Sequence, residues 1–306
     1  MRLNRLDLNL LVALNVLLDE QKITGAAVRL NVSQSTMSGM LGRLRIYFED
    51  ELLVQVGRVM QLTPLGRELA APVRELLLQI ESTIALRHEF VPETEQRHIR
   101  IIASDYMATA LIIPLMRELR RVAPRITIEL MAFSETPAEV ITSGLADLLI
   151  VPEELVSADH PYERLPPDDY SCVAWNGNNA ISDSLDIDTF LQCSHVIPLF
   201  GPARQFSLDE RFYRQHGIER KVMMYTHDFE SMAQIVVGTD LLATMPTQLA
   251  KICMGRYPIR LLQPPLALPR LQGCIQWHRH HTNDPCHRWL RSLLLDLANA
   301  LSIPRN

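Results

Sequence analysis

The chain has 306 residues and a formal net charge of −5, and 47% of its residues are hydrophobic and 21% charged. These values are typical of a soluble globular protein of two or three domains, and no run approaches the ~20 apolar residues that cross a bilayer, which excludes a membrane protein from the expected classes. The five cysteines include no CxxC pair, which favours reduced thiols in a cytoplasm and excludes a small disulfide scaffold.

The first predicted helix covers residues 7–18. Asp7 is its expected N-cap, because a carboxylate accepts hydrogen bonds from the free amides of a first helical turn. Five apolar residues recur at helical spacing and predict the buried face of this helix: Leu10, Ala13, Leu14, Leu17 and Leu18.

Residues 23–47, ITGAAVRLNVSQSTMSGMLGRLRIY, predict two short helices joined by a tight turn. One apolar stripe runs along the second helix and consists of Met37, Met40, Leu41, Leu44 and Phe48. The opposite face consists of Ser35, Gly39, Gly42 and Ile46, flanked by Ser38 and Arg43. A face so poor in bulk and in acidic groups suits a helix that lies close against a partner.

The start of this second helix indicates an anionic partner. Ser33 is the expected N-cap, so free amides beside Gln34, Ser35 and Thr36 favour an anion such as a phosphate. Gln34 can also pair with adenine in a DNA major groove through its carboxamide. The alternative, an ordinary capped helical hairpin, is about equally compatible with the pattern.

Residues 52–62 predict two short strands with Gly57-Arg58 at their tip. An arginine at this tip can enter a DNA minor groove, and the alternative is a solvated hairpin arginine. Residues 1–91 contain ten basic and ten acidic residues, so a DNA-binding surface would have to concentrate its basic groups locally. The arginines around the helix and hairpin are Arg29, Arg43, Arg45, Arg58 and Arg67.

Thr63 and Pro64 predict the start of a long helix, as cap and first helical residue. Four apolar residues then repeat at spacings of 4, 3 and 4, which is the pattern of a coiled-coil seam: Leu69, Val73, Leu76 and Ile80. The seam indicates a homodimer, although packing against the helix of residues 7–18 is an alternative for part of it. We expect Pro72 to bend this helix and residues 92–96 to form a hinge.

Beyond residue 97, strand and helix patterns alternate. Predicted strands cover residues 98–104, 126–133, 147–151, 170–175, 195–200, 221–227 and 273–278. Predicted helices cover residues 107–119, 137–146, 188–192, 207–216, 229–237 and 287–301. This order predicts parallel βαβ units with helices on both faces of each sheet, in an α/β fold of two subdomains joined by crossing strands.

Three segments occur in the order and spacing of a known DNA-binding domain: LDLNLLVAL, TGAAVRLNVSQSTMSGMLGRLR and LLVQVGRVMQLTPLGRELAAPV. Together they resemble the winged helix-turn-helix of the LysR-type transcriptional regulators. GLADLLIV (144–151), VVGTDLLATMP (236–246) and WHRHHTNDPCHRWLR (277–291) extend the resemblance over nearly the whole chain. Ser35 replaces the family's usual proline and Arg45 its frequent glutamate. Both departures are similar to the branch of nodulation regulators and regulators of nitroaromatic and chlorophenol breakdown.

The resemblance implies a winged helix-turn-helix over residues 1–63, a linker and dimerisation helix over 64–91, and an effector-binding domain of periplasmic-binding-protein type over 92–306. Subdomain I would cover about 97–165 and 268–306, and subdomain II about 166–267. The implied partners are double-stranded promoter DNA, a small-molecule effector, further copies of the chain in a homodimer or homotetramer, and RNA polymerase. The implied DNA-binding residues are Gln34, Ser35, Thr36, Ser38, Gly39, Arg43 and Arg58.

An effector site is expected beyond the carboxyl ends of the predicted strands, where open α/β folds bind ligands. The residues that follow or end these strands are Ser104, Phe133, Val151, Phe200, Gly201, Pro202, His227 and Phe229. Ser104 and His227 supply polar contacts and the phenylalanines an apolar wall, which suits a flat aromatic molecule with an acidic oxygen, such as a phenol, a substituted benzoate or a flavonoid. The alternative is that the phenylalanines are core and the effector is a non-aromatic metabolite.

Other chemistry has little support in the sequence. His278, His280, His281, His287 and Cys286 lack HExxH or CxxC spacing, so no metal site and no cofactor are expected. GxSxG, Walker A and GxGxxG motifs do not occur, so the competing class, an enzyme or solute-binding protein with an appended helical hairpin, is not favoured. Met223, Met224 and Met245 are expected in the core.

Overall fold

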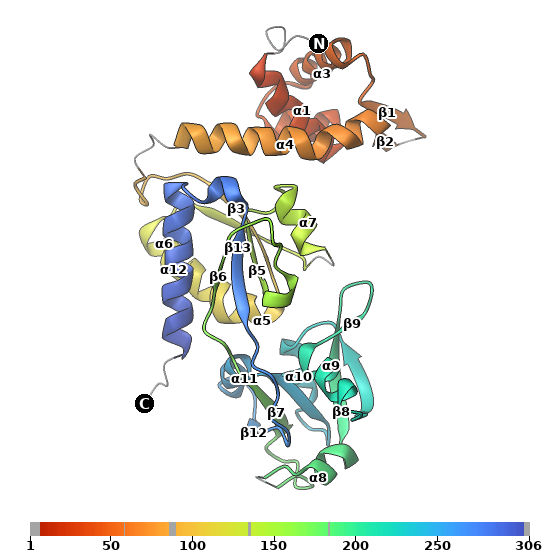
Figure 1. Cartoon of the computed structure of the whole chain (residues 1–306), viewed down its shortest axis with the longest axis vertical. Coiled ribbons are helices and arrows are strands. Elements are labelled where there is room, and N and C mark those ends of the chain that lie inside the picture. The colour runs from red at the N-terminus through yellow and green to blue at the C-terminus, as the bar shows by residue number, and fades with distance from the viewer. Residues whose placement is uncertain (1–6, 58, 86–89, 134–135, 183, 303–306) are drawn as a thin grey trace. The chain divides into compact units, whose positions relative to one another are not determined.

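The computed structural model describes residues 7–57, 59–85, 90–133, 136–182 and 184–302 (Figure 1). The chain divides into two compact units, Met1–His88 and Glu89–Asn306. Each unit has its own hydrophobic core, and each is described separately. Among the described residues, no helix is long and apolar enough to cross a membrane.

The first unit contains α1 (Leu8–Glu20), α2 (Ile23–Arg29), α3 (Gln34–Phe48), β1 (Leu53–Val56), β2 (Val59–Leu62) and α4 (Pro64–Ala85). Asp7 caps α1 by accepting a hydrogen bond from the amide of Asn9, and Ser33 caps α3 by accepting one from Thr36. All five residues of the predicted α1 face are buried, as are Met37, Leu41 and Leu44 of the α3 stripe. The predicted helical pair and its core face are therefore confirmed.

The two strands pair antiparallel, and Gly57 at their tip has a φ of 65°, in the left-handed region that favours glycine. Arg58 lies outside the described residues. The hydroxyl of Thr63 accepts a hydrogen bond of 3.0 Å from the amide of Gly66 and so caps α4 as predicted. A Cβ on Gly66 would lie 2.6 Å from the carbonyl oxygen of Leu52, so only glycine lets α4 start this close to β1.

The predicted α4 seam is divided between two environments. Leu69 and Val73 pack in the first unit's core with α1, so the alternative of packing within the chain holds for the first half of the seam. Leu76 is 42% exposed, and Ile84, further along the helix, is 71% exposed. The helix continues through Pro72. The second half of α4 thus presents apolar side chains that its own unit does not cover.

The second unit contains two sheets (Figure 1). The five-stranded sheet has the order β4 (Thr127–Met131), β3 (His98–Ala103), β5 (Leu148–Pro152), β13 (Gly273–Trp277), β6 (Tyr162–Arg164). The second sheet has the order β10 (Lys221–Thr226), β8 (Ser194–Phe200), β11 (Leu242–Pro246), β7 (Tyr170–Trp175), β12 (Ile259–Leu262), with β9 (Gln205–Phe206) paired to β8. We call the elements of the first sheet subdomain I and those of the second subdomain II.

Both sheets are mixed: each contains the predicted parallel strands and adds strands that run antiparallel to them. Strands β4, β3 and β5 are parallel, as are β10, β8 and β11. Strands β13, β7 and β12 instead pair antiparallel with their neighbours. The reversal follows from the chain path, because the chain crosses from subdomain I to subdomain II after β6 and returns after β12.

Helices cover both faces of each sheet, as predicted. Subdomain I has α5 (Asp105–Met107), a π-helical turn (Ala108–Ile112), α6 (Ile113–Val122), α7 (Pro137–Thr142), α12 (Pro285–Ser302) and 3₁₀ turns at Glu153–Leu155 and Arg279–His281. Subdomain II has α8 (Ile187–Gln192), α9 (Leu208–Gln215), α10 (Glu230–Ile235) and α11 (Thr247–Met254). Alternate residues of a strand therefore enter different cores: Ile101 packs on one face of the first sheet and Ile102 on the other.

The methionine prediction is right at one position and wrong at two. Met245 is fully buried in the central strand β11. Met223 is 65% exposed and Met224 43% exposed, together with Tyr225 at 47%. These residues lie on β10, which is an edge strand with no further strand beyond it in the described sheet. Residue type alone could not distinguish a central strand from an edge.

Candidate DNA-binding helix and effector cavity

The exposed start of α3 is lined with polar groups. Gln34, Ser35, Thr36, Ser38 and Gly39 are all exposed. The Oγ of Ser33 lies 2.8 Å from the Oγ of Ser35 and 2.8 Å from the Oγ1 of Thr36, so three hydroxyls gather at the first turn. Hydroxyls and the positive end of a helix dipole form a surface that suits a phosphate. The structure thus brings these predicted DNA-binding residues onto one exposed surface.

The two glycines of α3 have no internal reason to lack a side chain. A Cβ placed on Gly39 or Gly42 meets no atom within 4 Å. A glycine within a helix is less stable than alanine by about 0.5–1 kcal/mol, so its presence costs stability here. The face of α3 that carries Gly39 and Gly42 is therefore suited to close contact with another molecule.

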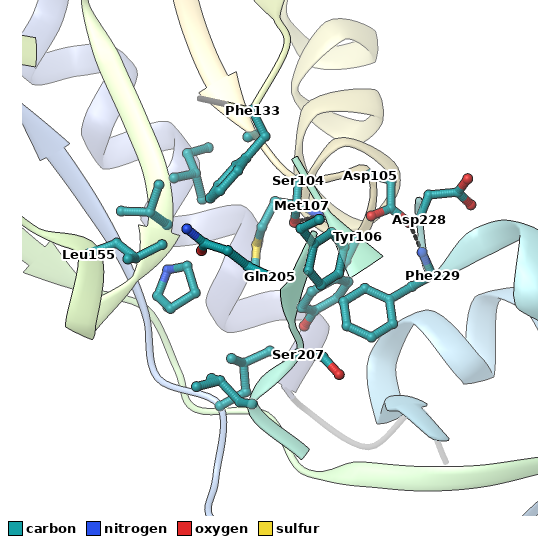
Figure 2. A pocket seen from close by; sticks show the side chains of 18 of the residues that line it. Ser104, Asp105, Tyr106, Met107, Phe133, Leu155, Gln205, Ser207, Asp228 and Phe229 are labelled. Carbon is teal, nitrogen blue, oxygen red and sulfur yellow. Dashed lines mark hydrogen bonds between the residues drawn. The ribbon is translucent and has the colours of Figure 1, made fainter. Parts of the chain in front are cut away.

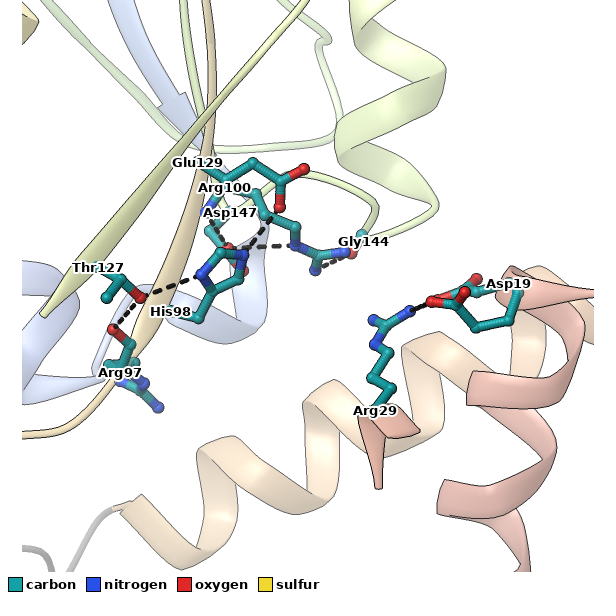
Figure 3. A network of polar contacts seen from close by, with 10 residues as sticks. Asp19, Arg29, Arg97, His98, Arg100, Thr127, Glu129, Gly144 and Asp147 are labelled. Carbon is teal, nitrogen blue, oxygen red and sulfur yellow. Dashed lines mark hydrogen bonds and ion pairs between the residues drawn. The ribbon is translucent and has the colours of Figure 1, made fainter. Parts of the chain in front are cut away.

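Most arginines near α3 already have partners within the chain. Arg45 donates to the carbonyl oxygens of Glu51 and Leu53, both at 2.9 Å, and so ties the end of α3 to β1. Arg67 donates to the carbonyl of Leu62, and Arg29 pairs with two acidic residues at the end of α1 (Figure 3). Arg43 is 59% exposed with a 3.5 Å contact to Asp7. Arg43 is thus the most available of the four described arginines.

A cavity of about 640 Å³ lies between subdomains I and II (Figure 2). Its size is in the usual range of small-molecule sites. Subdomain I contributes the end of β3 with α5, Phe133 and the end of β5 with the 3₁₀ turn that follows. Subdomain II contributes the end of β8, the segment from β9 into α9, and the segment between β10 and α10.

Six of the eight residues predicted for the effector site line this cavity: Ser104, Phe133, Val151, Phe200, His227 and Phe229. Gly201 and Pro202 do not line it, because the chain turns away after Phe200 and returns as β9. The rings of Phe200 and Phe229 lie 5.2 Å apart, and Phe229 is 6% exposed, so part of the aromatic wall is also core. The side chain of His227 is 92% exposed, which places it at the rim.

Pro152, which directly follows Val151 at the predicted strand end, also lines the cavity. The cavity further contains groups that the sequence did not indicate: Ala103, Asp105, Tyr106, Met107, Ile150, Glu154, Leu155, Tyr170, Gln205, Phe206, Ser207, Leu208, Arg211, Asp228, Leu271 and Gly273. Three of them are acidic, Asp105, Glu154 and Asp228, whereas Arg211 is the single arginine or lysine of the described lining. The cavity is therefore apolar with an acidic balance.

Polar contacts join the subdomains on both sides of the cavity. The carboxylate of Asp105 accepts hydrogen bonds of 2.7 and 2.9 Å from the amides of Phe229 and Glu230 (Figure 2). Arg211 of α9 donates to Glu154 of subdomain I at 2.7 Å. Burial raises the pKa of Asp105, partly offset by the two amides that stabilise its charged form. A ligand in the cavity would lie between these two links.

Four buried histidines, His160, His278, His281 and His287, lie in subdomain I. His278 follows the carboxyl end of β13, whereas Gly273 at the other end of this strand lines the cavity. The ring of His278 lies 4.6 Å from that of His160 and 6.4 Å from that of His281, and His281 stacks on His287 at 4.8 Å. Burial and the neighbouring histidines lower the pKa of His278 to about 3, and burial likewise lowers the pKa of His287. Among the described residues, no group of three or more His, Cys, Asp or Glu is arranged to hold a metal ion.

Comparison with known families matches both units. The model of the LysR substrate binding domain matches residues 92–299, and that of the bacterial regulatory helix-turn-helix proteins of the lysR family matches residues 8–67. Nodulation protein D of Bradyrhizobium sp. (strain ANU 289) is 37% identical over 302 residues, which covers 99% of this chain and 89% of that protein.

Solved structures share the same architecture. The probable transcriptional regulator PA0477 from Pseudomonas aeruginosa has a TM-score of 0.73 and 27% identity, over 95% of this chain and 97% of its own. Full-length CbnR in complex with its target DNA has a TM-score of 0.59 and 13% identity, over 97% of this chain and 100% of its own. At 13% identity the second likeness concerns the fold alone.

Proposed function

This chain belongs to the LysR family of transcriptional regulators, and we propose that it controls a catabolic or signalling operon in response to a small aromatic effector. Members of this family are DNA-binding regulators with an effector-binding domain and are not enzymes, so the competing class of enzyme or solute-binding protein no longer applies. We also propose that the protein works in the cytoplasm, on promoter DNA and together with RNA polymerase.

DNA reading is assigned to α3 and the β1–β2 hairpin. The residues proposed to contact DNA are Gln34, Ser35, Thr36, Ser38, Gly39, Arg43 and Arg58, of which Arg58 lies outside the described residues. The exposed, small and acid-free face of α3 supports this assignment. We expect Gln34→Ala to relax the sequence preference, at about 1–3 kcal/mol per lost base contact.

Gel-shift titrations at two salt concentrations test this assignment. The probe is an operator selected from a pool of random duplexes with the full-length protein. Arg58→Ala should weaken binding and flatten its salt dependence, because one phosphate or groove contact is lost. Arg125→Ala, an exposed arginine of subdomain I, is the control. Parent-like binding by both Gln34→Ala and Arg58→Ala would assign the reading to another surface.

We propose that the domains follow the boundaries 1–63, 64–91 and 92–306 and that two copies associate through the exposed half of α4. The apolar side chains Leu76 and Ile84 support this interface. Both are exposed to solvent in a single chain, and a second α4 packed against them would bury them. A two-fold dimer matches a two-fold DNA site, and a pair of dimers gives the homotetramer expected for the family.

The effector is proposed to bind between subdomains I and II. The observation that supports an aromatic effector is the 640 Å³ cavity lined by Phe133, Phe200 and Phe229. An effector that contacts both walls favours the arrangement in which the walls are close, so binding would shift the population of subdomain arrangements and thereby the DNA complex. Phenols, substituted benzoates and flavonoids are the candidate classes.

Calorimetric titration of the full-length protein with a panel of these three classes tests the effector proposal. We expect heat of binding from at least one class, and loss of that heat in Phe229→Ala. Because Phe229 is also core, Phe133→Ala, whose ring is only partly buried, is the companion variant. If no member of the panel binds, the effector is not aromatic.

A further inference from the structure

Two buried tyrosines line the cavity, and only one of them has a hydrogen-bond partner. The hydroxyl of Tyr106 donates to the carboxylate of Asp168 at 2.8 Å. Tyr170, the first residue of β7, is 6% exposed, and its hydroxyl has no hydrogen-bond partner among the residues that the structure describes. A hydroxyl that lines the cavity without a protein partner is available to hydrogen-bond a ligand there.

The Tyr170 hydroxyl can act as a donor at any physiological pH. Burial raises its pKa, and the charges of Asp209, Glu154 and Asp168 raise it further. The phenol therefore keeps its proton. As a donor it can bind a ligand oxygen that reaches Tyr170 inside the cavity.

The charges of the cavity decide which acceptor fits. Glu154, Asp105 and Asp228 line it, and its single described arginine, Arg211, already pairs with Glu154 at 2.7 Å. A ligand carboxylate would meet the acidic wall and would have to compete with Glu154 for Arg211, and like charges repel each other. A neutral hydroxyl accepts from Tyr170 without adding charge, and its own hydrogen can be donated to an acidic group.

We propose that the effector is an uncharged hydroxyl-bearing aromatic molecule, anchored by a hydrogen bond from Tyr170, and that the acidic wall rejects aromatic carboxylates. This inference rests on the proposed effector function of the same cavity. It moves the polar anchor from Ser104 and His227 to Tyr170. The hydroxyl of Ser104 already accepts a hydrogen bond from the amide of Met107 at 3.3 Å, and the side chain of His227 is almost fully exposed.

The test uses two sets of ligands that differ in one substituent. The first set is 4-methylphenol, 4-methylanisole and 4-methylbenzoate, and the second is 4′-hydroxyflavone, 4′-methoxyflavone and flavone-4′-carboxylate. Each is titrated at pH 7 into the full-length protein by calorimetry. We expect the parent to bind the hydroxyl compound of at least one set more tightly than its methyl ether and its carboxylate.

Tyr170→Phe removes only the unpartnered hydroxyl and should bind the hydroxyl compound about three- to tenfold more weakly, as for one neutral hydrogen bond. Tyr162→Phe is the matched control, since Tyr162 is exposed, bonds Glu153 at 3.4 Å and does not line the cavity. Glu154→Gln removes one acidic group and should strengthen binding of the carboxylate compound several-fold.

The outcomes separate this inference from the proposal on which it rests. If no compound of either set binds the parent, the aromatic effector itself is wrong and the anchor falls with it. If the hydroxyl compounds bind and Tyr170→Phe binds them like the parent, or if the carboxylates bind the parent most tightly, the effector site stands and the Tyr170 anchor is wrong. Thermal melting of each variant verifies that it is folded.

Discussion

The small residues on the exposed face of α3 are not required by the packing of the first unit. Because open space surrounds Gly39, we expect Gly39→Ala to stabilise the first unit by about 0.5–1 kcal/mol. The added methyl group should hold DNA away from α3 and weaken operator binding by about 1–3 kcal/mol, as for one lost base contact. Thermal melts and gel shifts of the same preparation check both effects. A more stable variant with parent-like operator binding would contradict the close approach of DNA.

The buried histidines predict acid sensitivity of the second unit. In the unfolded chain His278, His281 and His287 have pKa values near 6.5, whereas in the folded chain burial lowers all three. The unfolded state therefore binds more protons below that pH, so the free energy of unfolding is fully retained above it and falls as the pH drops toward the folded-state pKa.

The slope should be about 1.4 kcal/mol per pH unit for each histidine that stays neutral. Urea unfolding at pH 7.5, 6.0 and 5.0 measures it, and the fluorescence of Trp175, Trp277 and Trp289 reports the second unit alone. His278→Gln should flatten the pH dependence of the free energy of unfolding. Equal slopes in the parent and His278→Gln would show that this histidine titrates normally.

At the scale of the element, α4 supports a prediction about assembly. Leu76→Glu places two acidic side chains opposite each other across a two-fold α4 interface, which should cost about 3–5 kcal/mol of association free energy and give monomers. Leu76 is 42% exposed within its own chain, so the fold should persist. Sedimentation velocity measures the change, with Ala71→Glu on another face of α4 as the control. An unchanged oligomer would place the interface elsewhere.

Local patterns predicted most of the helices and strands, because each depends on spacing within one segment. The caps at Asp7, Ser33 and Thr63 and the buried stripe of α3 are examples. Strand direction depends on contacts far apart in the sequence, which spacing does not report. The antiparallel pairing of β13 with β5, and the edge position of β10 with its exposed Met223 and Met224, were therefore missed.

The same limit explains which cavity residues were missed. Ligands of open α/β folds bind beyond the carboxyl ends of the strands, and this rule correctly identified Ser104, Val151 and Phe200 as residues that line the cavity. Tyr170 is at the amino end of β7, but β7 runs antiparallel to β11, and Tyr170 pairs with Pro246 at the carboxyl end of β11. Because β7 runs in the opposite direction, its amino end lies at the same edge of the sheet as the carboxyl end of β11, and Tyr170 therefore reaches the cavity. Glu154 and Arg211 come from a 3₁₀ turn and from within α9, where no strand-end rule applies.

At the scale of the whole effector-binding unit, the link at Asp105 should stabilise the arrangement in which both cavity walls are close. Asp105→Asn weakens its bonds to the amides of Phe229 and Glu230 by removing the charge, so the open arrangement gains population and effector binding should weaken about three- to tenfold. Hydrogen exchange at these two amides should become faster.

Asp228→Asn is the matched control for this variant. Asp228 lines the same cavity, but its carboxylate accepts a hydrogen bond from the amide of Ser231 in its own subdomain, at 2.6 Å. It therefore changes the cavity charge without breaking a link between the subdomains. Equal effects of the two variants on hydrogen exchange at Phe229 and Glu230 would assign the change to charge and not to the link.

The chain path also dictates an order of events during synthesis. Strand β5 (Leu148–Pro152) pairs with β13 (Gly273–Trp277), and the whole of subdomain II is made between them. At about 5–20 residues per second, roughly 6–25 s pass before β13 leaves the ribosome, with α12 still to come. Subdomain II can fold in that interval, whereas one edge of the apolar strand β5 stays unpaired. The nascent chain therefore carries an aggregation-prone edge in subdomain I, where chaperone contact is to be expected, while subdomain II is already complete.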